Sequence, residues 1–349
     1  MRPKLAVVIP IYNAKPYLEE CLRSVADQHF SDLDVILVDD GSTDESVPIA
    51  RRFVAEDKRF RLFVQSSRKG PGAARNIGLR QISDSVDYFS FVDSDDVLPR
   101  NAYSALLASI ESSNSDMAAG NVHRFDSFGS YQFEKHIHDF GDLKVRTNIF
   151  ETPGLFMDRT VWNKVYRRTF WEKQRLFFRE GLLYEDAPFV VPLYCLAESV
   201  DIVNEVVYLW RIREGGAPSI TQQRTVSGMA DRFTAIDLVR TFLKSGTATA
   251  DGMLLSYDRN LLQEEVPLFF DEFVEEDEDY RCEFVKRAAE LLDDFPTQLF
   301  AGIPQELRNV YSAIVSGRAG DLVGLLQPLL EDAAWRDRLF MSTARPRGL

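Results

Sequence analysis

Three aspartates, Asp93, Asp95 and Asp96, stand within four positions directly after an apolar run at 88–92. Two carboxylates two residues apart can bind a hard divalent cation such as Mg²⁺ or Mn²⁺, which also binds phosphate oxygens. Such a metal acts as a Lewis acid on a departing phosphate group. The alternative is that an aspartate caps a helix that begins near Pro99. A cap explains Asp96, but it does not explain why three negative charges that repel one another stand so close together. The cluster favours a metal site for an anionic substrate.

A second acidic pair, Glu185 and Asp186, has the residue types needed for proton transfer. A hydroxyl that attacks a carbon atom must lose its proton, and a positioned carboxylate can accept it. Asp186 also stands just before Pro188 and an apolar stretch, which is a favourable place for an N-cap. The two roles are compatible, because a capping residue projects its carboxylate in a fixed direction.

Four short apolar runs predict buried strands that alternate with helices. The strands are expected at 5–9, 35–38, 61–64 and 88–92, and the helices after Asn13, from Asp44, over 71–82 and from Pro99. This order predicts a mostly parallel sheet with helices on both faces, and ligands bind at the carboxyl ends of such strands. The aspartates at 39–40 and 93–96 both follow strands there. We therefore expect them to share one site.

Composition excludes several classes of function. The chain has 349 residues, 27% of them charged, and a net charge of -13, which argues against a nucleic-acid partner. The three cysteines are far apart, which is typical of a reducing compartment. No apolar run is long enough for a transmembrane segment, and the first one stops at Pro10. We expect a cytoplasmic protein, and a peripheral place at the inner face of the cell membrane stays open.

Helix-spaced apolar residues dominate the chain after about residue 225, for example Phe233, Ile236, Val239 and Leu243. We predict a catalytic domain at 1–225, with the nucleotide-sugar part at 1–100 and the acceptor side at 101–225. A smaller helical domain is expected at 226–349. Packing or assembly suits these helices, so a homo-oligomer formed through them stays open.

Four motifs in order, at 7–13, 38–44, 71–79 and 92–96, resemble family 2 glycosyltransferases of the GT-A fold. The resemblance covers roughly 4–220 and implies a Rossmann-like α/β domain that transfers a sugar from a nucleotide diphosphate. By this resemblance the donor-binding residues are Pro10, Tyr12, Asp40, Arg75, Asp93, Ser94, Arg211, Arg213 and Ser219. Asp95 would bind Mn²⁺ or Mg²⁺, and Asp93 the ribose.

Each donor residue also has a plainer interpretation. Pro10, Tyr12 and Asp40 match positions that hold the base, with Asp40 accepting from a pyrimidine N–H. Tyr12 could instead pack in the core, and Asp40 could form a turn with Gly41. Arg75 follows a glycine-rich helix start, which would help it to bind a phosphate or the base, but a surface arginine is the alternative.

On the acceptor side, the resemblance implies that Asp186 is the general base and that Glu185 orients the acceptor or supports the base. The segment at 208–221 is similar to a loop that folds over the donor diphosphate in bacterial relatives, with Arg211 or Arg213 and Ser219 as its clamp. Some relatives carry a metal-binding His between them. Residues 214–218 contain none, so water would complete the metal shell and two glycines suggest a mobile lid.

Acceptor binding is assigned to Trp162, Lys164 and Arg167. Lys164, Arg167 and Arg168 could hold the phosphates of an anionic polymer, although three exposed cations are equally typical of a solvated face. The predicted function is inverting, metal-dependent transfer of a hexose or N-acetylhexosamine from a UDP-sugar to a hydroxyl of teichoic acid or capsular polysaccharide. The acceptor is a glycan or polyol phosphate, and a lipid-linked form stays open. The alternative is a catalytically silent module that binds nucleotide sugars.

Overall fold

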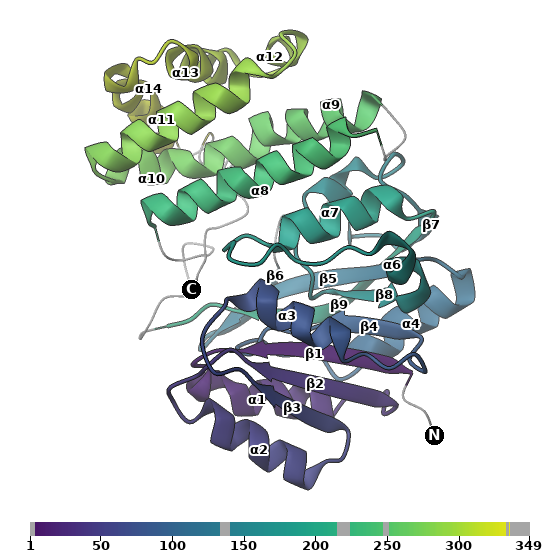
Figure 1. The fold of residues 1–349 in the computed structure, drawn as a ribbon. Helices are drawn as coiled ribbons and strands as arrows, with labels where there is room; N and C mark the ends of the chain where they lie inside the picture. Colours follow the sequence, from purple (N-terminus) through teal and green to yellow (C-terminus); the bar gives the residue numbers. More distant parts are fainter. Residues whose placement is uncertain (1–3, 133–139, 215–223, 247–250, 333–334, 336–349) are drawn as a thin grey trace. The chain divides into compact units, whose positions relative to one another are not determined.

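The four strands expected in the first hundred residues are all present in the computed structural model, and each is followed by a helix (Figure 1). The strands are β1 (Leu5–Ile11), β2 (Leu33–Asp39), β3 (Phe60–Val64) and β4 (Tyr88–Phe91). The helices are α1 (Lys15–Ala26), α2 (Ser46–Glu56), α3 (Pro71–Arg80) and α4 (Ala102–Ser113). Every residue of β1 and β2 is buried, which explains their continuous apolar sequences.

The structure describes residues 4–132, 140–214, 224–246, 251–332 and 335. The chain divides into two units, Met1–Ala217 and Pro218–Leu349. This division falls a few residues before the boundary predicted near residue 225. Both the carboxylate clusters and their supporting strands belong to the first unit.

The first unit is built on one sheet, whose described strands run in the order β3-β2-β1-β4-β8-β5-β9-β7, with β6 beside β5. The remaining elements are β5 (Met117–Asp126), β6 (Gly129–Gln132), β7 (Lys144–Thr147), η1 (Pro153–Phe156), β8 (Lys164–Arg167), α6 (Arg168–Gln174), α7 (Asp186–Leu196) and β9 (Val200–Arg211). β1 to β4 are parallel, as expected. β8 is antiparallel to both β4 and β5, so the sheet is mixed on the acceptor side.

Helices cover both faces of the parallel half, with α1 and α2 on one side and α3 on the other (Figure 1). α3 packs closely on β1 because of Gly78. A Cβ atom at this position would lie 2.2 Å from Cγ1 of Val8, which is closer than real atoms approach. Glycine thus lets the helix and the strand come together, as an alanine would not.

Two predicted helix starts are wrong in detail. α1 begins at Lys15, and Asn13 does not cap it. Asn13 instead has a φ of 47° and accepts a hydrogen bond from the backbone N–H of Thr43 over 2.8 Å. This bond ties the end of β1 to the loop after β2, where the donor residues were expected. The helix expected from Pro99 begins at Ala102.

The second unit is helical in its described parts, as predicted. Its elements are α8 (Val226–Lys244), α9 (Asp251–Asn260), η3 (Leu261–Glu265), η4 (Val266–Phe269), α10 (Phe270–Glu275), α11 (Glu278–Asp293), α12 (Gln298–Ala301), α13 (Gln305–Val315) and α14 (Ala319–Glu331). Buried Phe233, Phe269 and Phe284 pack against one another in its core. No described helix of either unit is long and apolar enough to span a bilayer.

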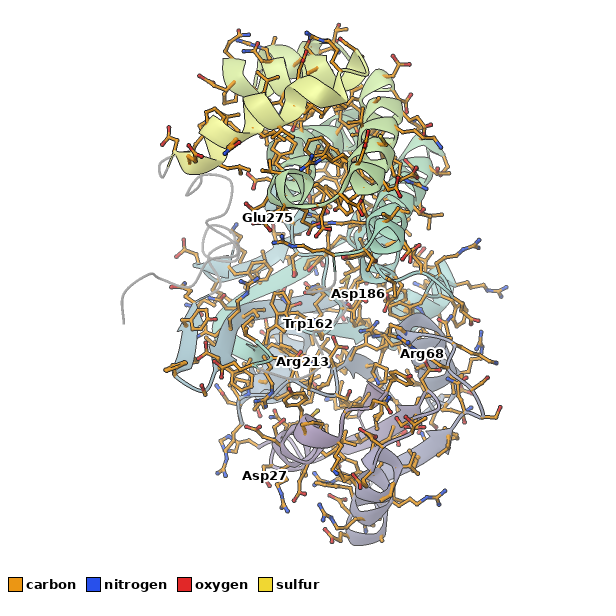
Figure 2. All side chains as sticks on the ribbon, turned by 90° about the vertical axis from the view of Figure 1, so that its left-hand side faces the viewer. Asp27, Arg68, Trp162, Asp186, Arg213 and Glu275 are labelled. Atoms are coloured by element: carbon orange, nitrogen blue, oxygen red, sulfur yellow. The ribbon has the colours of Figure 1, made fainter. Side chains whose placement is uncertain are left out.

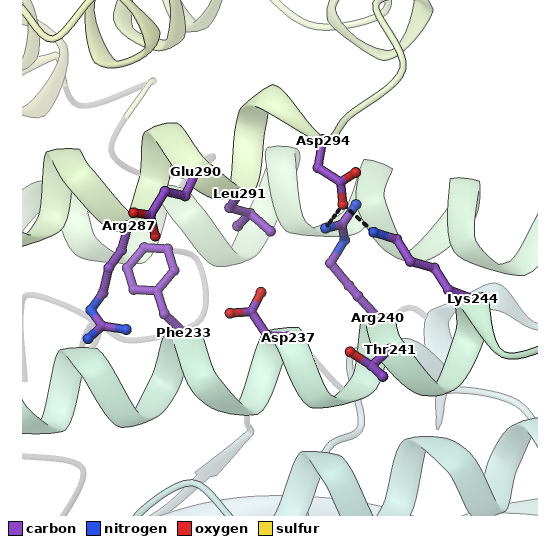
Figure 3. Close-up of a pocket in the computed structure, with 9 residues that line it drawn as sticks. All are labelled: Phe233, Asp237, Arg240, Thr241, Lys244, Arg287, Glu290, Leu291 and Asp294. Atoms are coloured by element: carbon purple, nitrogen blue, oxygen red, sulfur yellow. Dashed lines mark hydrogen bonds and ion pairs between the residues drawn. The ribbon is translucent and has the colours of Figure 1, made fainter.

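A buried ion-pair network connects the helices of this unit. Arg240 donates to Asp258 over 2.8 Å and to Asp294 over 2.7 Å, and Lys244 also contacts Asp294 (Figure 3). Arg240, Lys244 and Asp294 border a cavity of about 280 Å³ between α8 and α11. Because each of these arginine bonds is made to a protein carboxylate, the network is structural.

Candidate active site

The predicted base-binding residue Asp40 is held at the end of β2 by the loop that leads into α3. Its side chain is only 2% exposed. Oδ1 accepts from the backbone N–H of Lys69 and from Nε2 of Gln65, both over 2.8 Å, and Oδ2 accepts from the N–H of Gly70 over 2.7 Å. A carboxylate accepts about four hydrogen bonds, so Oδ2 retains room for one more. Burial raises the pKa of Asp40, while the two backbone bonds oppose the shift.

Tyr12 follows β1 and is 37% exposed, so it is not a core residue. The guanidinium of Arg68 lies 4.4 Å from the centre of its ring. Tyr12 is next to Ile11, whose backbone oxygen accepts from the N–H of Asp40 over 2.8 Å, so the ring follows the strand end that adjoins Asp40. Pro10 is buried within β1 and paired with Val38, where it shapes the strand end rather than exposing a polar group.

The most heavily charged point of the site is the buried side chain of Arg75 on α3. Nη2 donates to Oδ1 of Asp93 over 2.7 Å, and Nη1 donates to Oδ1 of Asp186 over 3.0 Å and contacts Glu185. The surface-arginine interpretation is therefore wrong. One guanidinium joins the acidic motif after β4 to the acidic pair at the start of α7, although about a hundred residues separate them.

The three aspartates after β4 do not converge on a common point. Asp93 binds Arg75, Asp95 binds Arg213 over 2.7 Å, and Asp96 accepts from the hydroxyl of Tyr208 over 2.7 Å. Asp96 also accepts from a backbone N–H of β9, and it does not cap a helix. Their mutual repulsion is thus answered by arginines and hydroxyls, which removes the argument that it requires a cation. Burial raises the pKa of both Asp95 and Asp96.

A divalent cation fits this strand end only as a partner of a single carboxylate. Within the described residues no group of three or more His, Cys, Asp or Glu side chains is arranged to hold a metal. Asp95 is the candidate that the resemblance names, and like Asp93 and Asp96 it already has a protein partner, the guanidinium of Arg213. Mg²⁺ and Mn²⁺ sites in phosphate-binding enzymes often use one or two carboxylates and complete their shell with phosphate and water.

The two arginines at the end of β9 support this strand end. Arg213 binds Asp95 directly, and Nε of Arg211 donates to the backbone oxygen of Asp95 over 2.6 Å. Arg211 also forms an ion pair with Glu20 over 2.6 Å. Ser94 is buried between the two acidic residues that flank it in the sequence. Ser219, the third part of the expected clamp, lies outside the described residues.

Glu185 and Asp186 have unusual proton affinities for carboxyl groups. Burial raises the pKa of both, Arg75 opposes the shift, and repulsion from neighbouring carboxylates adds to it. Asp186 is the first residue of α7, and no side chain caps this helix, so the capping interpretation is wrong. The carboxylate of Asp186 faces Arg75 instead. An acid in the first turn is still favourable, because the helix N-terminus carries partial positive charge.

The three predicted acceptor residues are largely enclosed. Lys164 is 0% exposed, and its ammonium forms an ion pair with Asp158 over 2.7 Å. Arg167 donates to the backbone oxygen of Ser115 over 3.0 Å. The expectation of two exposed cations is therefore wrong, because both are satisfied by the protein. Trp162 is also buried, in a stack on another ring of the site.

Sequence reasoning missed two residues of this site. Tyr208 on β9 donates to Asp96, accepts from the backbone N–H of Asp93 over 3.1 Å, and stacks on Trp162 with ring centres 4.0 Å apart. Tyr208 stands two residues before Trp210, and alternate residues of a strand lie on the same face. This spacing could have indicated that the two rings share one face of β9. Arg68 had no such signal. Figure 2 labels Arg68, Trp162, Asp186 and Arg213, which four separate segments of the first unit contribute.

Comparison with known proteins identifies the family to which this chain is similar. The model of glycosyl transferase family 2 matches residues 6–175. Glycosyltransferase GlyA of Streptococcus pneumoniae is 32% identical over 249 residues, which are 67% of this chain and 34% of GlyA. Glycosyltransferase GlyG of the same organism is 29% identical over 232 residues, 62% of this chain and 73% of GlyG. The chain thus spans about a third of GlyA and most of GlyG.

A solved structure has the same fold over nearly the whole chain. A fragment of Staphylococcus aureus TarS in complex with UDP-GlcNAc superposes with a TM-score of 0.76 at 19% identity. The match covers 93% of this chain and 90% of that fragment. The chain therefore belongs to family 2 of the glycosyltransferases, and its first unit has the GT-A fold.

Proposed function

We propose that this protein is an inverting glycosyltransferase that moves a hexose or N-acetylhexosamine from a UDP-sugar to a hydroxyl of a cell-surface polymer. The observation that carries the proposal is the junction at Arg75. Its guanidinium binds Asp93 of the donor motif and Glu185 and Asp186 of the acceptor motif. A module that only bound nucleotide sugars would need no second acidic pair at its donor site.

The chemical step needs one proton acceptor and one leaving group. Asp186 takes the proton of the acceptor hydroxyl as the oxygen attacks the anomeric carbon, and the bond from that carbon to the nucleotide diphosphate breaks with its electron pair. Attack opposite the leaving group inverts the configuration at the carbon. Arg75, which also pairs with Glu185, holds Asp186 in place. The raised pKa of Asp186 makes it a better proton acceptor than an exposed aspartate.

We further propose that Asp95 binds Mn²⁺ or Mg²⁺ together with the donor diphosphate. A bound metal would supply Lewis-acid stabilisation of the departing diphosphate. Arg213 lies beside Asp95, and Arg211 beside its backbone, so both side chains stand where negative charge develops. Their role is electrostatic, like that of other positively charged clamps on phosphates.

The proposed donor and acceptor rest on relatives and on the base site. The TarS fragment was solved with UDP-GlcNAc, and TarS is named a poly(ribitol-phosphate) β-N-acetylglucosaminyltransferase. This chain is 26% identical to TarS over 218 residues, which are 36% of TarS. In this chain the open position on Oδ2 of Asp40 suits the N–H of a uracil, and Tyr12 offers a ring for it to stack on. A polyol phosphate or a glycan is the corresponding acceptor.

A panel of UDP- and GDP-sugars tests the function without knowledge of the acceptor. Slow hydrolysis of one UDP-sugar with Mn²⁺, and not with a chelator, is expected. The anomeric configuration of a product made from an α-linked donor should be β, as NMR coupling constants will report. Binding of UDP-sugars without hydrolysis or transfer to teichoic or capsular acceptors would instead favour the silent module.

A further inference from the structure

A groove on the first unit lies outside the site described above. It occupies about 340 Å³ between the end of α3 and the helix α6. Leu79, Ile82, Trp171 and Phe177 form its apolar walls. Phe177 is 44% exposed, although large aromatic residues normally bury most of their surface. An exposed ring beside a concave apolar surface is suited to a ligand with carbon-rich faces.

The charges around this groove are mainly positive. Arg175 lines it, Arg80 lies with its guanidinium 5.4 Å from the ring centre of Phe177, and Arg179 follows Phe177 in the chain. All three arginines are exposed, and within the described residues none is within ion-pair distance of a carboxylate. The remaining arginine of the groove is different, because Arg168 is paired with Glu172. In a chain of net charge -13, the two unpaired cations at this groove, Arg80 and Arg175, stand out as an anion-binding surface.

The groove is connected to the carboxylate cluster along α3. Asn76 binds the backbone of Phe178 through both its side-chain atoms, over 3.0 Å and 2.9 Å. Near the other end of α3, a Cβ on Gly72 would lie 3.1 Å from the backbone oxygen of Arg179 and 3.2 Å from Cγ of Glu185. The segment after Phe177 therefore runs along α3 from the groove to the acidic pair, about 15 Å for ten helical residues.

We propose that this groove binds a stretch of the anionic acceptor polymer, several units away from the hydroxyl that reacts. The proposal rests on the function proposed above. Arginine pairs well with phosphate oxygens, and the apolar walls would contact the carbon atoms of a polyol or sugar. A concave surface fits a chain better than it fits a flat bilayer. The groove would give the enzyme a preference for long, phosphate-containing acceptors over short ones.

The double variant Arg80→Gln with Arg175→Gln tests the proposal. Transfer is measured to a long poly(ribitol phosphate) chain and to a single ribitol-phosphate unit. The KM for the long chain should rise about three- to ten-fold, as expected for the loss of two exposed ion contacts, with an unchanged kcat. The KM for the single unit should stay as in the wild type. The matched control is Arg51→Gln with Lys286→Gln, two exposed cations on α2 and α11, and it should change neither KM.

Three outcomes would overturn the proposal. They are an unchanged KM for the long chain, an equal rise for both acceptors, and a double variant that loses binding to phosphatidylglycerol vesicles while its affinity for the long chain is unchanged. The last result would assign the groove to a membrane surface. Calorimetry with the long chain alone, without donor, separates this proposal from the proposed function. Polymer binding that depends on Arg80 and Arg175 would persist even if no donor were ever turned over.

Discussion

Nη1 of Arg75 donates to Oδ1 of Asp186 over 3.0 Å, so the proposed base is held by a helix that precedes it by 111 residues. Arg75 also binds Asp93. One positive charge therefore balances carboxylates from both halves of the site. The relationship makes the position of the base dependent on the donor half of the fold, and it leads to the first prediction.

Arg75→Met should destabilise the protein by about 3–5 kcal/mol, because it leaves buried carboxylates without their cation. Urea unfolding measures the difference. Arg51→Met is a suitable control, since Arg51 is an exposed residue of α2, and it should stay within about 0.5 kcal/mol of the wild type. A loss below about 1 kcal/mol in Arg75→Met would contradict the view that Arg75 stabilises these buried carboxylates.

Asp186→Asn should reduce transfer by about 10²–10⁴-fold, the usual contribution of a general base. The side chain keeps its shape but no longer accepts the proton. UDP affinity, measured by calorimetry, should not change, since Asp40 and Tyr12 lie on other segments. Asp84→Asn, at a fully exposed carboxylate, is the control. Near-normal transfer by Asp186→Asn would assign the base to Glu185.

The rate of transfer should depend on pH through Asp186. A base must be deprotonated to act, and burial raises the pKa of Asp186. Activity should therefore fall as the pH falls through an inflection well above the ordinary aspartate value of about 4. Asp93→Asn removes a neighbouring negative charge that raises the pKa of Asp186, which should move the inflection to lower pH. A rate that stays constant down to about pH 4 would count against this assignment.

Asp95→Asn should remove the increase in UDP affinity that Mn²⁺ produces. An amide is a much weaker ligand for a hard cation than a carboxylate is. Calorimetric titration of UDP with Mn²⁺ and with a chelator gives the increment directly. Far-ultraviolet circular dichroism checks that the fold survives the loss of the Asp95–Arg213 ion pair. An increment equal to that of the wild type would rule out Asp95 as the metal ligand.

The parallel half of the fold was predictable because of its burial. Strands such as β1 and β2 are covered on both faces, so their sequences are continuous apolar runs and their carboxyl ends mark the site. The acceptor half was harder to predict. β8 is antiparallel and only four residues long, and its Lys164 belongs to a basic and aromatic sequence typical of a surface. Its burial depends on Asp158, a partner that spacing alone does not identify.

The roles of some acidic residues were also difficult to predict, because their partners are backbone N–H groups. By sequence alone, the acidic run at 275–279 is typical of a solvated loop. Asp277 instead caps α11 by accepting from the N–H of Tyr280, and Glu278 and Asp279 occupy the first turn of the helix. Negative charge is favourable there, because free N–H groups point outward at a helix start. Asp96 shows the reverse case, since a helix cap was its alternative interpretation and it accepts from a tyrosine hydroxyl instead.

The close approach of Gly78 to Val8 limits how this enzyme can vary between species. Any larger residue at position 78 would push α3 away from β1, and Arg75 stands one turn earlier on the same helix. The guanidinium would then be displaced from carboxylates on two different segments at once. A methyl group added at position 78 would thus reduce the rate of transfer, although this position carries none of the reacting side chains. A loss-of-function allele at this glycine would leave every reacting side chain intact.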